Sequence, residues 1–72
     1  MGENDKAKIL KGLGEKLRKA REEANLTQAD VATKVGMDLN YYARIERGVG
    51  NPSFLKLHSI MKALGLKSLS IE

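Results

Sequence analysis

Residues 27–48 read TQADVATKVGMDLNYYARIERG, and this stretch predicts two short helices joined by a tight turn. We expect the first helix over about residues 28–35 and the second over about residues 39–47. Thr27 suits the N-cap of the first helix, because its hydroxyl can accept a hydrogen bond from a free backbone N–H. Asp30, three residues later, is placed to bond back to Thr27 in a capping-box pattern.

The turn between the two helices has residues that helix ends prefer. Gly36 can adopt a left-handed backbone angle without steric cost, which ends the first helix and turns the chain. Asp38 then suits the N-cap of the second helix, and Gly48 closes that helix as Gly36 closes the first. Two helices that cross steeply about such a turn form the helix-turn-helix motif.

Small and apolar residues favour close packing of this pair. Val31, Ala32 and Val35 share one face of the first helix. Tyr42 and Ile45 lie three residues apart on the second. Because Ala32 is small, it allows two helices with a short connection to cross closely. The usual role of such a unit is to place its second helix in the major groove of DNA.

The residues before this unit predict one long helix over about residues 7–24. Gly12 and Gly14 weaken its early turns by about 1 kcal/mol each relative to alanine. Residues 1–6 are polar and are expected to form a flexible tail. Apolar residues recur along the helix at steps of three and four, as in an amphipathic stripe: Leu10, Leu13, Leu17, Ala20 and Ala24.

A loop follows the unit, and a last helix is expected up to about Leu64, where Gly65 stops it. Pro52 suits the first position of this helix with Asn51 as its cap, and Ser53 is the competing cap. The chain therefore predicts an all-α domain over residues 7–72, a compact bundle of four to five helices. Its expected core residues are Leu13, Leu17, Val31, Val35, Ile45, Leu57, Ile60 and Leu64.

Composition narrows the class of protein only slightly. The chain has 72 residues, no cysteine and a formal net charge of +4. A domain of this size is marginal alone, which leaves dimerisation open. The charge favours a polyanionic partner, although it also fits simple solubility. With no long apolar run and no signal-peptide pattern, we expect no membrane partner and a cytoplasmic location.

No group of residues points to catalysis or metal binding, so we expect neither enzyme activity nor a cofactor. His58 is the only histidine, and a lone histidine is far more often a surface residue than a catalyst. The segment Gly12-Leu13-Gly14 matches only a fragment of a nucleotide-binding fingerprint, and no strand precedes it.

Six short motifs occur in order along the chain: Leu17-Arg18-Lys19-Ala20-Arg21, Leu26-Thr27-Gln28, Val31-Ala32, Val35-Gly36, Arg44-Ile45-Glu46-Arg47-Gly48 and Asn51-Pro52-Ser53. In this order and spacing they resemble the Cro/repressor-type (XRE-like) helix-turn-helix family. That family includes small phage-type repressors, restriction–modification controller proteins and some antitoxins. The resemblance covers about residues 13–66. It implies a lambda-repressor-like bundle that binds double-stranded operator DNA as a homodimer.

The resemblance implies base-reading positions at the start and outer face of the second helix. Asn40 can pair bidentately with adenine and Arg44 with guanine, and their four-residue spacing turns both to the same side. Tyr41 can pack on a thymine methyl or bond a phosphate. Leu39 stands where a polar residue is common, so contact with a thymine methyl and packing inside are both open for it.

The resemblance also implies phosphate contacts. Gln28 matches the glutamine that contacts a phosphate and braces the recognition helix, and its amide can both donate and accept. The start of the last helix is a ready anion site, because its first backbone N–H groups are free. The expected phosphate-binding residues are Thr27, Gln28, Arg47, Asn51 and Ser53.

Three other positions are expected to be structural. Arg21 and Glu46 match the family's internal ion pair between the first and third helices, and removing one partner of such a pair is costly. Tyr42 stands where Ile or Val is usual, and we expect its ring to pack in the core with the hydroxyl at the edge.

The expected function is a sequence-specific transcriptional regulator that binds a near-palindromic operator as a homodimer. No effector domain is evident, so no small-molecule ligand is expected. The alternative is an interaction module of the same fold whose main partner is a protein. Asn40 and Arg44 favour DNA, whereas Leu39 and Tyr41 give weight to the alternative. The residues expected at the dimer interface are Leu55, Leu66, Leu69 and Ile71.

Overall fold

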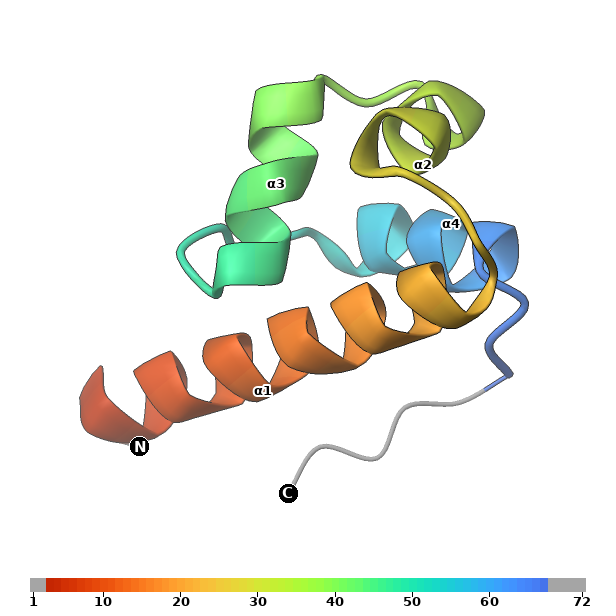
Figure 1. The fold of residues 1–72 in the computed structure, drawn as a ribbon. Helices are drawn as coiled ribbons and strands as arrows, with labels where there is room; N and C mark the ends of the chain where they lie inside the picture. Colours follow the sequence, from red (N-terminus) through yellow and green to blue (C-terminus); the bar gives the residue numbers. More distant parts are fainter. Residues whose placement is uncertain (1–2, 68–72) are drawn as a thin grey trace.

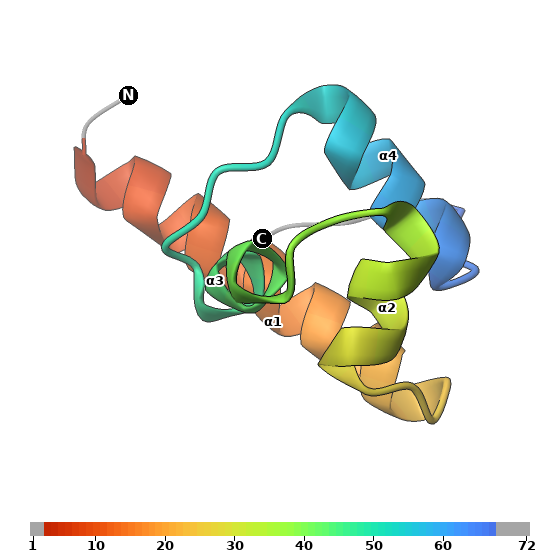
Figure 2. The ribbon, with the colours of Figure 1, turned by 90° about the horizontal axis from the view of Figure 1, so that it is seen from above.

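The computed structural model describes residues 3–67, which form four α-helices and no strand. These are α1 (Glu3–Glu23), α2 (Gln28–Val35), α3 (Leu39–Arg47) and α4 (Phe54–Ala63). Figure 1 shows α1 along one side of the molecule, with α3 standing over it and with α2 and α4 grouped beside them. In Figure 2 α3 is seen nearly end-on above α1, so these two helices cross steeply. The predicted all-α class is confirmed.

Helix α1 begins at Glu3, earlier than the expected start near residue 7. The helix thus includes residues 3–6, which the sequence pattern assigns to a tail. An acidic residue such as Asp5 is favourable near a helix N-terminus, because it complements the positive end of the helix dipole. Gly12 and Gly14 do not interrupt the helix.

Both helices of the central pair have the predicted bounds and caps. The Thr27 hydroxyl accepts from the Asp30 N–H at 3.0 Å, and the Asp30 carboxylate accepts from the Thr27 N–H at 2.8 Å. The bond from the Thr27 N–H, followed by the nearby Thr27 hydroxyl, lowers the pKa of the Asp30 carboxyl. Asp38 accepts from the Tyr41 N–H at 3.1 Å. Gly36, with φ of 66°, ends α2 in the left-handed conformation that favours glycine.

The start of α4 differs from the expectation. The helix begins at Phe54, and its N-cap is Ser53, whose hydroxyl accepts from the Lys56 N–H at 3.2 Å. The prediction of Pro52 as the first helical residue, with Asn51 as its cap, is therefore wrong, and the competing cap is the one used. A serine at this position satisfies a free N–H of the first turn.

The core lies between the four helices. Val35 and Leu57 were expected in it but are only half-buried at its edge, whereas Ala32 and Tyr42 are fully enclosed. The ring of Tyr42 is the largest fully buried side chain, as expected for a structural residue. The buried apolar residues are Leu13, Leu17, Val31, Ala32, Tyr42, Ile45, Ile60 and Leu64.

Gly14 is a point of close backbone approach between α1 and α3. A Cβ atom at this position would lie 2.6 Å from the carbonyl oxygen of Ile45 and would also overlap that of Glu46. Real Cβ atoms do not approach backbone atoms this closely. The glycine that lowers helix propensity thus allows α1 to pack directly against the C-terminal half of α3.

Candidate nucleic-acid interface

Helix α3 presents a polar side to solvent and an apolar side to the core. Asn40 and Arg44 are exposed and lie one helical turn apart, so they share a face. Tyr42 and Ile45 on the opposite side are fully buried, which fixes the rotation of the helix about its axis. The amide of Asn40 and the guanidinium of Arg44 are therefore held outward by a rigid element.

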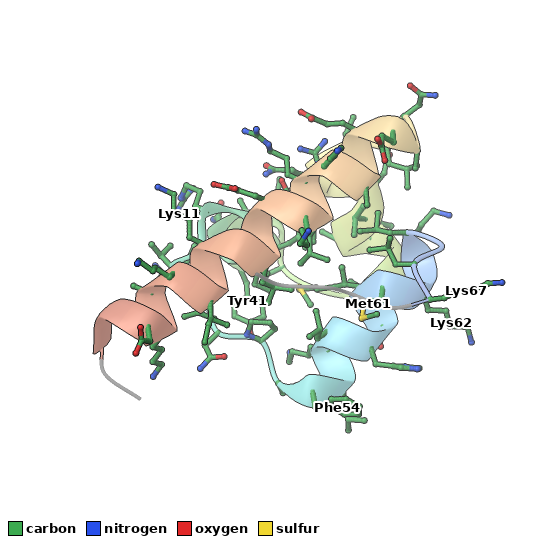
Figure 3. The ribbon with its side chains drawn as sticks, turned by 90° about the horizontal axis from the view of Figure 1, so that it is seen from below. Lys11, Tyr41, Phe54, Met61, Lys62 and Lys67 are labelled. Carbon is green, nitrogen blue, oxygen red and sulfur yellow. The ribbon has the colours of Figure 1, made fainter. Side chains whose placement is uncertain are left out.

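Tyr41 lies on the flank of α3 that faces α4. It is half-buried and packs against the core, and the ammonium nitrogen of Lys56 lies 5.2 Å from its ring centroid. Figure 3 shows Tyr41 between the ribbons of α1 and α4. Its ring is therefore less available to a base than the side chains of Asn40 and Arg44. Contact of Tyr41 with DNA stays a prediction.

Leu39 lies outside the core. The residue is 45% exposed, so its side chain does not pack inside the protein. Contact with a thymine methyl stays a prediction. It adjoins Asn40 at the N-terminal end of α3, where the first turn is capped by Asp38. An apolar group at this place is able to contact another apolar group, such as a thymine methyl.

A buried polar cluster connects α1, α2 and α3. The Arg21 Nε donates to one carboxylate oxygen of Glu46 at 2.7 Å, and its Nη2 donates to the other at 3.1 Å. The Gln28 side-chain N–H also donates to Glu46, at 3.0 Å, and Arg21 donates to the Leu26 carbonyl at 2.9 Å. Gln28 thus braces α3 from the start of α2.

The ionisation of this cluster follows from its contacts. The side chain of Glu46 is 2% exposed. Burial by itself raises the pKa of Glu46, but Arg21, the nearby Tyr42 hydroxyl and Gln28 outweigh burial and lower the pKa. The Glu46 carboxylate raises the pKa of Arg21 in turn. Both groups are therefore charged, and the negative charge of Glu46 is neutralised inside the protein.

The Tyr42 hydroxyl does not reach the protein edge as expected. It is buried and has no hydrogen-bond partner among the described residues. Burial raises the pKa of this hydroxyl, and the nearby Glu46 carboxylate raises it further. A buried hydroxyl without a partner lowers the stability of the folded state, because it has lost its hydrogen bonds to water. The burial of the Tyr42 ring offsets this cost.

The residues expected to bind phosphate lie at two places. Thr27 and Gln28 are at the start of α2, where the Thr27 hydroxyl caps the helix. Arg47, Asn51 and Ser53 are exposed at the end of α3 and in the following loop. The loop is tied back to α3, because the N–H groups of residues 49 and 50 donate to the Arg44 carbonyl at 3.0 and 3.1 Å.

The apolar residues expected at a dimer interface differ in exposure. Leu55 is 76% exposed, whereas Leu66 is half-buried and packs against the core. Leu69 and Ile71 lie outside the described residues. Phe54, which the sequence pattern does not single out for this role, is 78% exposed, and Figure 3 shows it pointing away from the molecule.

Metal clusters and membrane-spanning helices are two features that residues 3–67 do not show. Within this range, no group of three His, Asp or Glu side chains is arranged to hold a metal ion. None of the described helices combines the length and apolar character needed to cross a bilayer.

Comparison with known proteins identifies helix-turn-helix regulators as relatives of this chain. A family model described as "Helix-turn-helix" matches residues 17–71. An immunity repressor protein of Bacillus phage phi105 is 36% identical over 59 residues, which are 82% of this chain and 41% of the repressor. The chain thus spans about two fifths of that relative.

Two further relatives are uncharacterised HTH-type transcriptional regulators. The one from Sinorhizobium fredii is 31% identical over 63 residues, covering 88% of this chain and 82% of the relative. The one from Methanothermobacter thermautotrophicus is 37% identical over 49 residues, covering 68% of this chain and 71% of the relative. No solved structure gives a significant match.

Proposed function

Because the chain belongs to the helix-turn-helix family of DNA-binding transcriptional regulators, we propose that it reads a specific double-stranded DNA sequence with α3. The observation that carries this proposal is the outward face of α3, where Asn40 and Arg44 lie together on a helix anchored by its buried side. In the major groove, Asn40 pairs with adenine and Arg44 with guanine, each through two hydrogen bonds.

The buried cluster behind α3 suits this role. A free carboxylate facing the groove would repel the phosphates, but Glu46 is enclosed and paired with Arg21. Gln28 holds α2 and α3 together through Glu46 and keeps its amide oxygen for other partners. A recognition helix held at both flanks places its donors with little loss of conformational entropy on binding.

Phosphate contacts position the helix in the groove. We propose that Thr27 and Gln28 bind one stretch of the DNA backbone, and that Arg47, Asn51 and Ser53 bind another. At the start of α4 the first backbone N–H groups add to the second site, since a helix N-terminus attracts anions. Such contacts raise the affinity for every duplex and do not distinguish sequences.

The regulator acts as a homodimer on a near-palindromic operator. Each subunit places one α3 in the major groove, and the two half-sites lie about 34 to 36 Å apart. Leu55 and the residues near the C-terminus, Leu66, Leu69 and Ile71, supply the contact between subunits. The name of the phage relative favours repression, in which the bound dimer occupies a promoter.

Selection of bound duplexes from random DNA at moderate salt tests this function. We expect enrichment of one near-palindromic sequence with adenine and guanine at the positions facing Asn40 and Arg44. A matched selection with the Asn40→Ala variant should lose the preference for adenine and keep the rest. If the wild-type protein enriches no sequence, the alternative gains: an interaction module with a protein as its main partner.

A further inference from the structure

A hollow on the surface lies between α1, the start of α2 and the end of α3, and it extends the site beyond the helix-turn-helix pair. We propose that α1 itself binds the DNA backbone there, with Lys11 and Arg18 holding phosphates beside Arg47. This inference rests on the proposed function, because it deepens the same site. The hollow is lined by Lys11, Glu15, Arg18, Gln28, Glu46 and Arg47.

Two close backbone approaches build this hollow. A Cβ atom on Gly48 would lie 2.7 Å from the Cα atom of Lys11, so the end of α3 abuts α1 at this residue. Gly14 brings the next turn of α1 against the carbonyls of Ile45 and Glu46. Lys11 and Arg47 are consequently neighbours, although they are far apart in the sequence.

The exposed face of α1 continues from this contact. Lys11, Glu15 and Arg18 follow one another at steps of four and three residues, so they lie on one side of the helix. Seven residues of helix correspond to about 10.5 Å, which is far enough for Lys11 and Arg18 to reach different phosphates. In Figure 3 Lys11 projects from the flank of α1 that faces away from α4.

The charges in the hollow favour an anion. Glu46 is already bonded to Arg21 and Gln28, so it contributes little free negative charge. Among the described residues, neither Lys11, Arg18 nor Arg47 has a carboxylate within ion-pair distance. Glu15 is the one lining carboxylate without such a partner. Three cations facing one free carboxylate leave the surface positive.

The position of the hollow identifies the occupant. Arg47 follows Arg44 by three residues on the exposed side of α3, so the hollow continues from the groove-reading face. Gln28, at its other edge, belongs to the expected phosphate contacts at the start of α2. When α3 occupies the major groove, the strand that borders the groove must pass this surface. The ligand is therefore a phosphodiester of the bound duplex.

The salt dependence of DNA binding tests the proposal on the full chain. The logarithm of the DNA association constant falls linearly with the logarithm of the salt concentration. Lys11→Ala and Arg18→Ala should each make this line less steep by about 0.9, because each cation displaces about one counterion. Between about 50 and about 200 mM salt, each variant should then lose about 3.5-fold less affinity than the wild type. The preference for the selected sequence over a scrambled duplex should not change, since phosphates carry no base identity.

Lys16→Ala is the matched control. Lys16 is exposed on the same helix and makes the same change in charge and size, but it does not line the hollow. Its salt slope should equal that of the wild type. Lys11→Arg keeps the charge beside Gly48 and should retain the wild-type slope. Far-UV circular dichroism verifies that each variant is folded.

The outcomes separate the two proposals. If the wild type selects a sequence while Lys11→Ala and Arg18→Ala keep its slope, the α1 contact is refuted and the proposed function stands. If Lys16→Ala lowers the slope equally, the effect is that of overall charge, and the site is refuted as well. If the wild type prefers no duplex, both proposals fail.

Discussion

Arg44 is the side chain on which sequence preference should depend most. It is exposed on α3 above a fully buried Ile45, and its own carbonyl accepts two hydrogen bonds from the following loop. The backbone of Arg44 is thus fixed by the buried neighbour Ile45 and by the hydrogen bonds from the loop. A long side chain on a fixed backbone has fewer arrangements to lose when it pairs with a base.

Replacing Arg44 by alanine should cost about 1 to 3 kcal/mol on the selected sequence and relax the preference at a single base pair. The reason is the loss of two hydrogen bonds to one guanine. Competition titrations against all single-base variants of the operator measure this. Arg18→Ala is the contrast, since it should weaken every duplex alike. Uniform weakening by Arg44→Ala would identify Arg44 as a phosphate contact instead.

Tyr42 offers a second test at a single residue. Tyr42→Phe keeps the buried ring and removes a hydroxyl that has no hydrogen-bond partner. The free energy of unfolding should therefore stay the same or rise by up to about 1 kcal/mol. Urea denaturation measures it, with Tyr42→Ala as the destabilised reference, expected to lose about 3 kcal/mol or more. A loss above about 1 kcal/mol for Tyr42→Phe would show that the hydroxyl is bonded, with Glu46 as its neighbour.

At the scale of helices, the contact between α1 and α3 depends on Gly14. Gly14→Ala should destabilise the protein by about 1 to 3 kcal/mol, because the added methyl overlaps two backbone carbonyls and separates the helices. This sign is opposite to that of helix propensity, which favours alanine by about 1 kcal/mol. Gly12→Ala in the same helix is the control and should not destabilise. Thermal unfolding measures the stability of both variants. A Gly14→Ala protein as stable as the wild type would contradict the close contact between α1 and α3.

The pair of Arg21 and Glu46 joins the same helices. Arg21→Ala leaves a buried carboxylate without its cation, which should cost about 3 to 5 kcal/mol at pH 7. The direction in which the stability of the wild type changes with pH follows from the lowered pKa of Glu46 in the folded state. Its contribution to stability is present above the unfolded pKa of about 4.3 and is lost as the pH falls through the folded value.

In the Arg21→Ala variant that dependence should reverse, since burial without the cation raises the pKa of Glu46. The difference in unfolding free energy between variant and wild type should therefore shrink on going from pH 7 to pH 4. Urea denaturation at both pH values measures it. Glu46→Gln removes the titrating group and is the control. A difference that is constant with pH would mean that Glu46 does not titrate in this range.

For the whole molecule, the exposed apolar surface at the start of α4 is the feature that bears on dimerisation. Phe54 and Leu55 are neighbours and each is more than three-quarters exposed. A chain of 72 residues buries a limited core, so association is one route to added stability. We expect sedimentation at micromolar concentration to show a dimer and Leu55→Asp to shift it toward monomer.

Val49→Asp is a suitable control for this shift, because Val49 is also an exposed apolar residue and lies outside the expected interface. It should leave the dimer intact. A wild-type monomer that binds each half-site singly would remove the predicted interface. Such a result would leave the base-reading role of α3 untouched.

The sequence by itself determined the helix-turn-helix pair, with its bounds, its Thr27 capping box and its closing glycines. These features are local, because a cap or a turn involves atoms within about four residues of one another. Periodicity likewise indicated most of the core. The start of α4 was missed because Asn51 and Ser53 are both residue types that N-caps prefer, so residue type alone does not distinguish them.

Only the tertiary structure decided which side chains the helices bring together. It placed Tyr41 beside Lys56, left Leu39 outside the core, and made Gly14 a contact point in place of a weak turn. It also joined Lys11 and Arg18 of α1 to Arg47 of α3 in one hollow. Such neighbours depend on the crossing of helices that are distant in the chain, and no local pattern of residues records that angle.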